Sequence, residues 1–219
     1  MAEPASAYYD ARWGYRRFDA ERYERRRYGG FWRRLNLRLT QRALARGLAA
    51  VPPGGLVLDA PCGTGILGDF LRARGFRVVG ADISEAMLAV AGRRGSALGC
   101  VRADLESPPL KPASVDAVVS SRFLMHLPPA IRPRVLRTLA ELTRGPVVAT
   151  VCHPWTVKRF GRAVRRAFGG RAKQSPRLTR GELAAEVRSA GLVLEHVIPV
   201  MPLLSEVWVV VVRTPSAAA

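Results

Sequence analysis

Cysteine is scarce in this 219-residue chain, and long apolar runs are absent. The three cysteines, Cys62, Cys100 and Cys152, lie far apart without a Cys-x-x-Cys pair, which argues against a zinc site or a disulfide framework. We therefore expect small, buried thiols in a reducing compartment, and no metal. The longest apolar run, residues 207–212, has the length of a strand and not of a membrane span. With no leader-like segment at the N-terminus, the expected location is the cytoplasm.

Acidic residues are also few: the chain has 17 acidic and 35 basic residues, which gives a net charge of +18. The excess is concentrated in residues 1–50, with 12 basic and 5 acidic side chains, and in residues 151–180, with 9 and none. Such a field favours an anionic partner: nucleic acid, a phosphorylated or carboxylated substrate, or an acidic membrane surface. Only three of the basic residues are lysine, and this skew is equally consistent with genome composition.

Strand-like and helix-like segments alternate through the rest of the chain. We expect strands at residues 56–60, 76–81, 97–101, 115–121 and 146–151, and helices at residues 67–73, after Ser84 and at residues 129–142. This alternation predicts an α/β fold with a parallel sheet and helices on both faces. Two last strands, at residues 192–200 and 206–213, are separated by only five residues, too few for a crossover helix. They are therefore predicted to pair as an antiparallel hairpin.

Two basic segments fall outside this alternation. Residues 1–50 predict a helical cap rich in arginine and aromatic residues, and its second helix is expected at about residues 31–50. Residues 153–178 predict a basic helical insert or lid within the main domain, residues 51–219. We expect the cap to fold over the functional site from one side and the insert to close it from the other.

A glycine-rich turn follows the first predicted strand. Residues 63–68 match Gly-x-Gly-x-x-Gly at the start of a helix, where glycines let a ligand approach the backbone. Asp59, at the end of the strand, would repel a pyrophosphate but suits a ligand with an ammonium group, such as S-adenosylmethionine. Asp82, at the end of the second strand, can accept hydrogen bonds from both ribose hydroxyls. Asp104, after the third strand, can accept one from the adenine amine, with Leu105 against the ring.

Together these segments resemble the motifs of class I S-adenosylmethionine-dependent methyltransferases. The matching runs are VLDAPCGTG at residues 57–65, VGADISEAML at residues 79–88, ADL at residues 103–105, and VDAVV at residues 115–119 with the later pair His126-Leu127. The resemblance covers residues 51–150 closely and residues 180–213 more loosely. It implies a Rossmann-like, mostly parallel sheet of seven strands ending in the antiparallel hairpin, with S-adenosyl-L-methionine as the cofactor.

The resemblance also implies roles for individual positions. Asp59 is expected to serve the amino group of the cofactor, directly or through water, and Asp82 to hold its ribose. The remaining implied contacts are Gly63 and Gly65 along the methionine moiety, Ile83 on the adenine and Ser120 near the methyl group.

Methyl transfer is a displacement at a sulfonium with a good leaving group, so the protein mainly has to position the nucleophile. A general base is needed only when the acceptor is protonated. His126, after the fourth strand, and His153, after the fifth, are the candidate catalytic residues, and a structural role is the alternative for each. Arg122 is the candidate for holding an anionic substrate.

The leading hypothesis is a methyltransferase for a small or medium-sized acceptor, with anionic and lipid-like molecules among the candidates. The second is an RNA or other nucleic-acid methyltransferase whose basic segments bind phosphates. Against it, no recognised RNA-binding module and no Asn/Asp-Pro-Pro-aromatic motif is found. The third is an NAD-binding oxidoreductase or a non-catalytic nucleotide-binding module, which Asp59 and the predicted hairpin disfavour.

Overall fold

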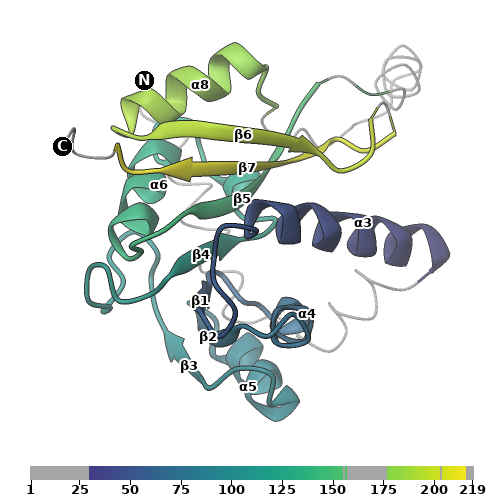
Figure 1. Ribbon diagram of the computed structural model, residues 1–219, viewed down its shortest axis with the longest axis vertical. Coiled ribbons are helices and arrows are strands. Elements are labelled where there is room, and N and C mark those ends of the chain that lie inside the picture. The colour runs from purple at the N-terminus through teal and green to yellow at the C-terminus, as the bar shows by residue number, and fades with distance from the viewer. Residues whose placement is uncertain (1–29, 155, 157–176, 203, 216–219) are drawn as a thin grey trace.

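The chain folds around a seven-stranded sheet (Figure 1). The computed structural model describes residues 30–154, 156, 177–202 and 204–215. The strands are β1 (Leu56–Asp59), β2 (Arg77–Asp82), β3 (Gly99–Arg102), β4 (Ala117–Ser120), β5 (Val147–Cys152), β6 (Val193–Pro199) and β7 (Val207–Arg213). The helices are α3 (Phe31–Gly47), α4 (Ile66–Arg72), α5 (Glu85–Arg94), α6 (Arg132–Glu141) and α8 (Arg180–Ser189), with a 3-10 turn, η2 (Leu124–His126).

The strand order is β3-β2-β1-β4-β5-β7-β6. Neighbours from β3 to β5 are parallel, and β7 runs antiparallel to both β5 and β6. The predicted Rossmann-like sheet with its C-terminal antiparallel hairpin is therefore confirmed. The order reverses between β1 and β4, and in open α/β sheets ligands bind outside the carboxyl ends of the strands at such a switch point.

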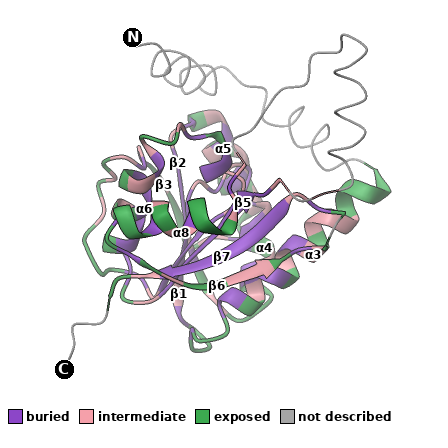
Figure 2. Ribbon diagram, turned by 90° about the horizontal axis from the view of Figure 1, so that it is seen from above, coloured by how far each residue is buried: buried purple, intermediate pink, exposed green. Residues whose placement is uncertain are grey.

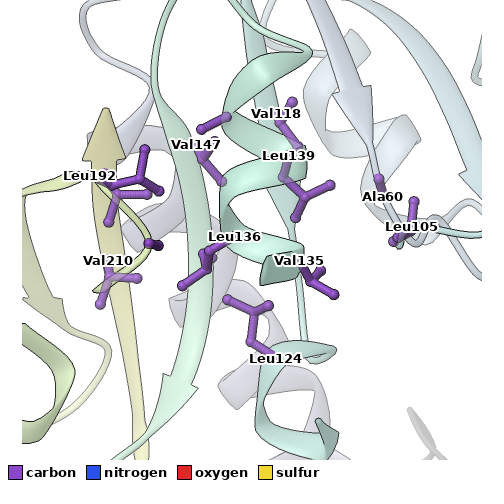
Figure 3. Close-up of a cluster of buried hydrophobic side chains, with 14 of the residues drawn as sticks. Ala60, Leu105, Val118, Leu124, Val135, Leu136, Leu139, Val147, Leu192 and Val210 are labelled. Atoms are coloured by element: carbon purple, nitrogen blue, oxygen red, sulfur yellow. The ribbon is translucent and has the colours of Figure 1, made fainter. Parts of the chain in front are cut away.

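Helices cover both faces of the sheet with separate apolar clusters. On one face, Leu136 and Leu139 of α6 and Leu183 of α8 pack over β4, β5 and β7 (Figure 3). On the other face, Leu44 of α3 packs over β5 and β7, and Leu71 of α4 packs over β2. Figure 2 shows β7 buried, in contrast to the exposed outer side of α8. An all-valine run beside Trp208 suits β7, because a central strand must be apolar on both faces.

Local signals account for several element ends. The side chain of Ser84 accepts a hydrogen bond from the N–H of Met87 at 3.4 Å and caps α5, as expected. Thr179 and Glu182 form a reciprocal capping box at the start of α8. The helix predicted at residues 129–142 begins three residues later, at Arg132, because residues 129–131 form a turn in which the N–H of Ile131 donates to the carbonyl oxygen of Pro128 at 3.0 Å.

The expectation that all three cysteines are buried is wrong for Cys100. Cys62 and Cys152 are buried, but Cys100 is exposed because β3 is an edge strand, covered on one side only. The first part of the cap and nearly all of the insert, residues 157–176, lie outside the described residues, so the domain division stays a prediction. No helix in the described part of the chain combines the length and the apolar character that crossing a membrane requires.

Candidate cofactor and acceptor site

A cavity lies at the carboxyl ends of β1, β2 and β4, at the switch point. Helix α3 forms its opposite wall through Leu37, Thr40, Gln41 and Leu44. Six of the residues predicted from the sequence line it: Asp59, Gly63, Asp82, Ile83, Arg122 and His126. Helix α3, which the sequence predicts as the second helix of the cap, therefore contributes to the wall of this site.

Asp59 is the most unusual residue of the cavity wall. Its side chain is 1% exposed, and its Oδ2 atom has no hydrogen-bond partner among the residues that the structure describes. Burial raises the pKa of this carboxyl well above its usual range, and the nearby Asp82 carboxylate adds to the rise. A buried carboxylate without a partner is costly unless a cation or a hydrogen-bond donor reaches it. The free oxygen therefore fits the ammonium group of an amino-acid ligand.

Asp82 holds the glycine-rich loop in place. Its Oδ2 accepts a hydrogen bond from the N–H of Gly63 at 2.9 Å, and its Oδ1 accepts one from the N–H of Ser84 at 2.9 Å. Burial raises the pKa of Asp82, and these hydrogen bonds offset part of the rise. Each oxygen keeps a second lone pair, so the predicted contact with ribose hydroxyls is compatible with this loop-anchoring role, which the sequence analysis missed.

The two glycines of the loop meet different constraints. Both have a positive φ, 54° at Gly63 and 78° at Gly65, a conformation that other residues rarely adopt. A side chain added at Gly63 would meet no protein atom within 4 Å, so its Cα faces open space along the cavity. At Gly65 a Cβ would lie 3.2 Å from the Cα of Ala91, so this glycine allows α4 and α5 to approach each other. Gly65 is not among the residues that line the cavity.

Arg122 supplies a cation to the cavity wall beyond the end of β4. Its backbone lies in the left-handed region, with φ 59°, which is strained for a residue other than glycine. Its N–H donates a hydrogen bond to Oγ1 of Thr150, on β5, at 2.6 Å. Thr150 is fully buried and therefore holds Arg122 from the neighbouring strand. Nothing in the sequence pattern singled out this contact.

The two candidate histidines occupy different surroundings. His126 ends the η2 turn and lines the cavity. His153 is buried, and its ring stacks on Trp208 with centroids 4.4 Å apart. Its Nε2 lies 3.0 Å from the carbonyl oxygen of Ser205, and it is not among the lining residues. Burial lowers the pKa of His153, and contacts with Ser205 and Glu206 offset part of that shift.

Three further predicted residues lie beside the cavity rather than on its wall. Asp104 accepts a hydrogen bond at Oδ1 from the N–H of Glu106 at 3.1 Å. Leu105 packs into the apolar cluster under α6 and α8. Ser120 is fully buried, and its Oγ has no partner among the described residues. Their predicted contacts with the cofactor stay predictions.

The family model of the methyltransferase domain matches residues 57–145, the stretch that builds this cavity from β1 to β4. Over these residues the chain is similar to the methyltransferase domains of this family, as the motifs in the sequence predict. This match supports the predicted enzyme class and cofactor. The unpartnered oxygen of Asp59 and the open space over Gly63 fit that cofactor.

The relatives that this chain matches are named for different acceptors. A malonyl-acyl carrier protein O-methyltransferase of Serratia marcescens is 32% identical over 127 residues, which are 57% of this chain and 49% of that protein. An 18S rRNA (guanine-N(7))-methyltransferase of Bos taurus is 39% identical over 89 residues, 39% of this chain and 31% of that protein. The chain thus spans half or less of the length of both relatives.

A solved structure shares the fold over nearly the whole length. The magnesium protoporphyrin IX methyltransferase of Synechocystis PCC 6803, determined with bound SAH (S-adenosylhomocysteine), superposes with a TM-score of 0.72 at 21% identity. The superposition covers 94% of this chain and 99% of that one.

Proposed function

We propose that this protein transfers a methyl group from S-adenosylmethionine to a small or medium-sized acceptor that carries an anionic group. The observation that carries the cofactor half is the buried, unpartnered Oδ2 of Asp59 on the cavity wall. The observation that favours an anionic acceptor is the strained and anchored Arg122 on the same wall.

The chain's own residues divide the work of binding. Asp59 holds the amino group of the cofactor, and Gly63 leaves room for its methionine moiety. Asp82 keeps the glycine loop in place and offers its remaining lone pairs to the ribose, with Ile83 beside the adenine. When bound, S-adenosylmethionine supplies an electrophilic methyl group on a sulfonium. A cavity that positions the acceptor toward this group needs few further catalytic groups.

Arg122 and His126 are the residues for the acceptor. The guanidinium fork of Arg122 suits the planar, two-oxygen geometry of a carboxylate. Such an anionic oxygen is already deprotonated and needs no general base. His126 is then the base only for acceptors that carry a proton. The relative from Serratia marcescens is named as an O-methyltransferase of malonyl-acyl carrier protein, and a malonyl group ends in a carboxylate.

A nucleic-acid acceptor is the second candidate. It is favoured by the net charge of +18 and by the match to an rRNA methyltransferase. The described part of the cavity wall supports the first candidate better, because Arg122 is the one arginine or lysine among the described lining residues, and one cation suits a small anion rather than a run of phosphates.

The test is transfer of a labelled methyl group to two sets of acceptors: carboxylates, among them malonyl thioesters, and total RNA. We expect label in an alkali-labile methyl ester, with little label in RNA. Arg122→Ala should lower transfer to carboxylates at least tenfold, while the affinity for SAH stays unchanged. Salt-sensitive labelling of RNA that survives Arg122→Ala would instead establish the second candidate. NAD binding without binding of SAH would overturn both.

A further inference from the structure

Three neighbouring strands place an unusual row of residues next to the glycine loop. Asp59 on β1 pairs with Gly80 on β2, and Gly80 pairs with Cys100 on β3. Paired residues of parallel strands direct their side chains to the same face of the sheet. Gly80 has no side chain, so the row leaves an opening between Asp59 and Cys100.

Cys62 lies over that opening. A Cβ at Gly80 would stand 3.0 Å from Sγ of Cys62 and 3.3 Å from Sγ of Cys100. Both sulfur atoms therefore lie next to the same point above Gly80. The N–H of Cys62 donates to the carbonyl oxygen of Ala81 at 2.8 Å, which fixes Cys62 against β2. The missing side chain at Gly80 is what gives the two thiols room to meet.

The two thiols differ in access. Cys62 is 9% exposed, and it lines the cavity as the residue before Gly63. Cys100 is exposed on the edge strand. Cys100 is thus the more accessible of the two residues, and Cys62 lies at the candidate cofactor site.

We infer that Cys62 and Cys100 form an oxidisable thiol pair, which a small organic disulfide converts into an intramolecular disulfide that competes with the cofactor. The exposed Cys100 attacks the organic disulfide and forms a mixed disulfide, and one thiol leaves. Cys62 then attacks the sulfur of Cys100, and the second thiol leaves. Two protein S–H bonds are replaced by one S–S bond, and the organic disulfide is reduced to two thiols.

The coupling to the cofactor follows from the position of Cys62 and rests on the proposed function. To bond with Cys100, the sulfur of Cys62 must move toward β3, and this pulls on the loop that carries Gly63. A ligand that holds the loop in place must therefore disfavour formation of the disulfide, and the disulfide must lower the affinity for the ligand by the same factor. Burial raises the pKa of both thiols, so the exchange is expected to be slow and to speed up with rising pH.

The test is to incubate the purified full-length chain with oxidised glutathione and to follow its intact mass, with peptide mapping of the cross-link. We expect the loss of two hydrogen atoms and a Cys62–Cys100 cross-link. Cys152→Ser, which removes the third thiol, should form it at the same rate. Cys100→Ser should abolish it, and Cys62→Ser should stop at a glutathione adduct on Cys100. A stable adduct on Cys100 in the wild-type chain would overturn the pair.

The coupling is tested by repeating the oxidation with saturating SAH. We expect bound SAH to slow cross-linking at least about fivefold, and the oxidised chain to bind SAH at least about fivefold more weakly. Unchanged rates, although calorimetry shows SAH bound, would overturn the coupling. Failure of the reduced chain to bind SAH would count against the proposed function, whereas the mass measurement would still decide the thiol pair.

Discussion

The two halves of the cavity wall are built by different kinds of contact. At the ends of β1 and β2, Asp82 reaches backbone N–H groups 19 and 2 residues away in the chain. At the end of β4, the backbone of Arg122 depends on Thr150 of β5, 28 residues away. The cofactor half is thus assembled from neighbouring loops, and the acceptor half from distant strands. One sheet can therefore keep a constant cofactor site beside a variable acceptor site.

The largest effect is expected for Asp82→Ala. The variant leaves the N–H groups of Gly63 and Ser84 without their acceptor, and each buried unsatisfied group costs about 1–3 kcal/mol. We predict a fall in melting temperature of about 5–15 °C, together with loss of SAH binding. Differential scanning fluorimetry and calorimetry measure the two effects. Glu195→Gln, on β6 in an ion pair with Arg213, is the matched control and should change neither. Unchanged stability in Asp82→Ala would contradict its loop-anchoring role.

Asp59→Asn should separate binding from stability. Because burial raises the pKa of Asp59, the folded chain holds a proton that the unfolded chain loses above its ordinary pKa of 3.8. The free energy of unfolding of the ligand-free protein therefore falls as the pH rises from 3.8 toward the raised pKa. SAH needs the ionised form, so its affinity rises over the same window. Asp59→Asn should weaken the stability trend, of which the raised pKa of Asp82 maintains a part, and should remove the affinity trend, as melting curves and titrations across pH would show.

The two histidines sharpen the contrast between cavity and core. His153→Ala should cost about 1–2 kcal/mol of stability, because it removes a buried hydrogen bond and a stacked ring pair. The pKa of His153 is lowered, so its contribution is complete above 6.5 and is lost as the pH falls toward the lowered pKa. His126→Ala should leave stability unchanged and slow transfer to acceptors that carry a proton. Denaturant titrations measure the loss of stability, and turnover assays measure the loss of activity. A stability loss in His126→Ala together with a turnover loss in His153→Ala would contradict these assignments.

The smallest effect is expected for Thr150→Val. The change keeps the shape of the side chain but removes the acceptor for the N–H of Arg122, at a cost of about 1 kcal/mol. We predict a raised KM for the acceptor and an unchanged Kd for SAH. Thr150→Ser, which keeps the hydroxyl, should restore the KM. An equal loss in both variants would show that packing, and not the hydrogen bond, matters at this position.

The sequence predicted the sheet and the cofactor half because their signals are local. A strand that ends in an acidic residue occurs within residues 56–59 and again within residues 77–82, and a glycine-rich turn follows the first of them. Parallel strands bring both ends to one edge of the sheet. The position of His153 could not be predicted, because its partner Trp208 comes from β7, which inserts beside β5 only in the folded sheet. The same holds for Thr150 under Arg122, and for Cys100, whose exposure depends on β3 being the edge strand.

The most direct measurement compares two ligands on two proteins by calorimetry. SAH carries the amino-acid tail, and 5′-methylthioadenosine has the same adenosine and thioether without it. If Asp59 binds the amino group, Asp59→Asn should lower the affinity for SAH by about 10- to 100-fold, and should leave the affinity for methylthioadenosine unchanged. Equal losses for both ligands, or no loss for SAH, would contradict the assignment of the unpartnered Asp59 oxygen to the cofactor's amino group.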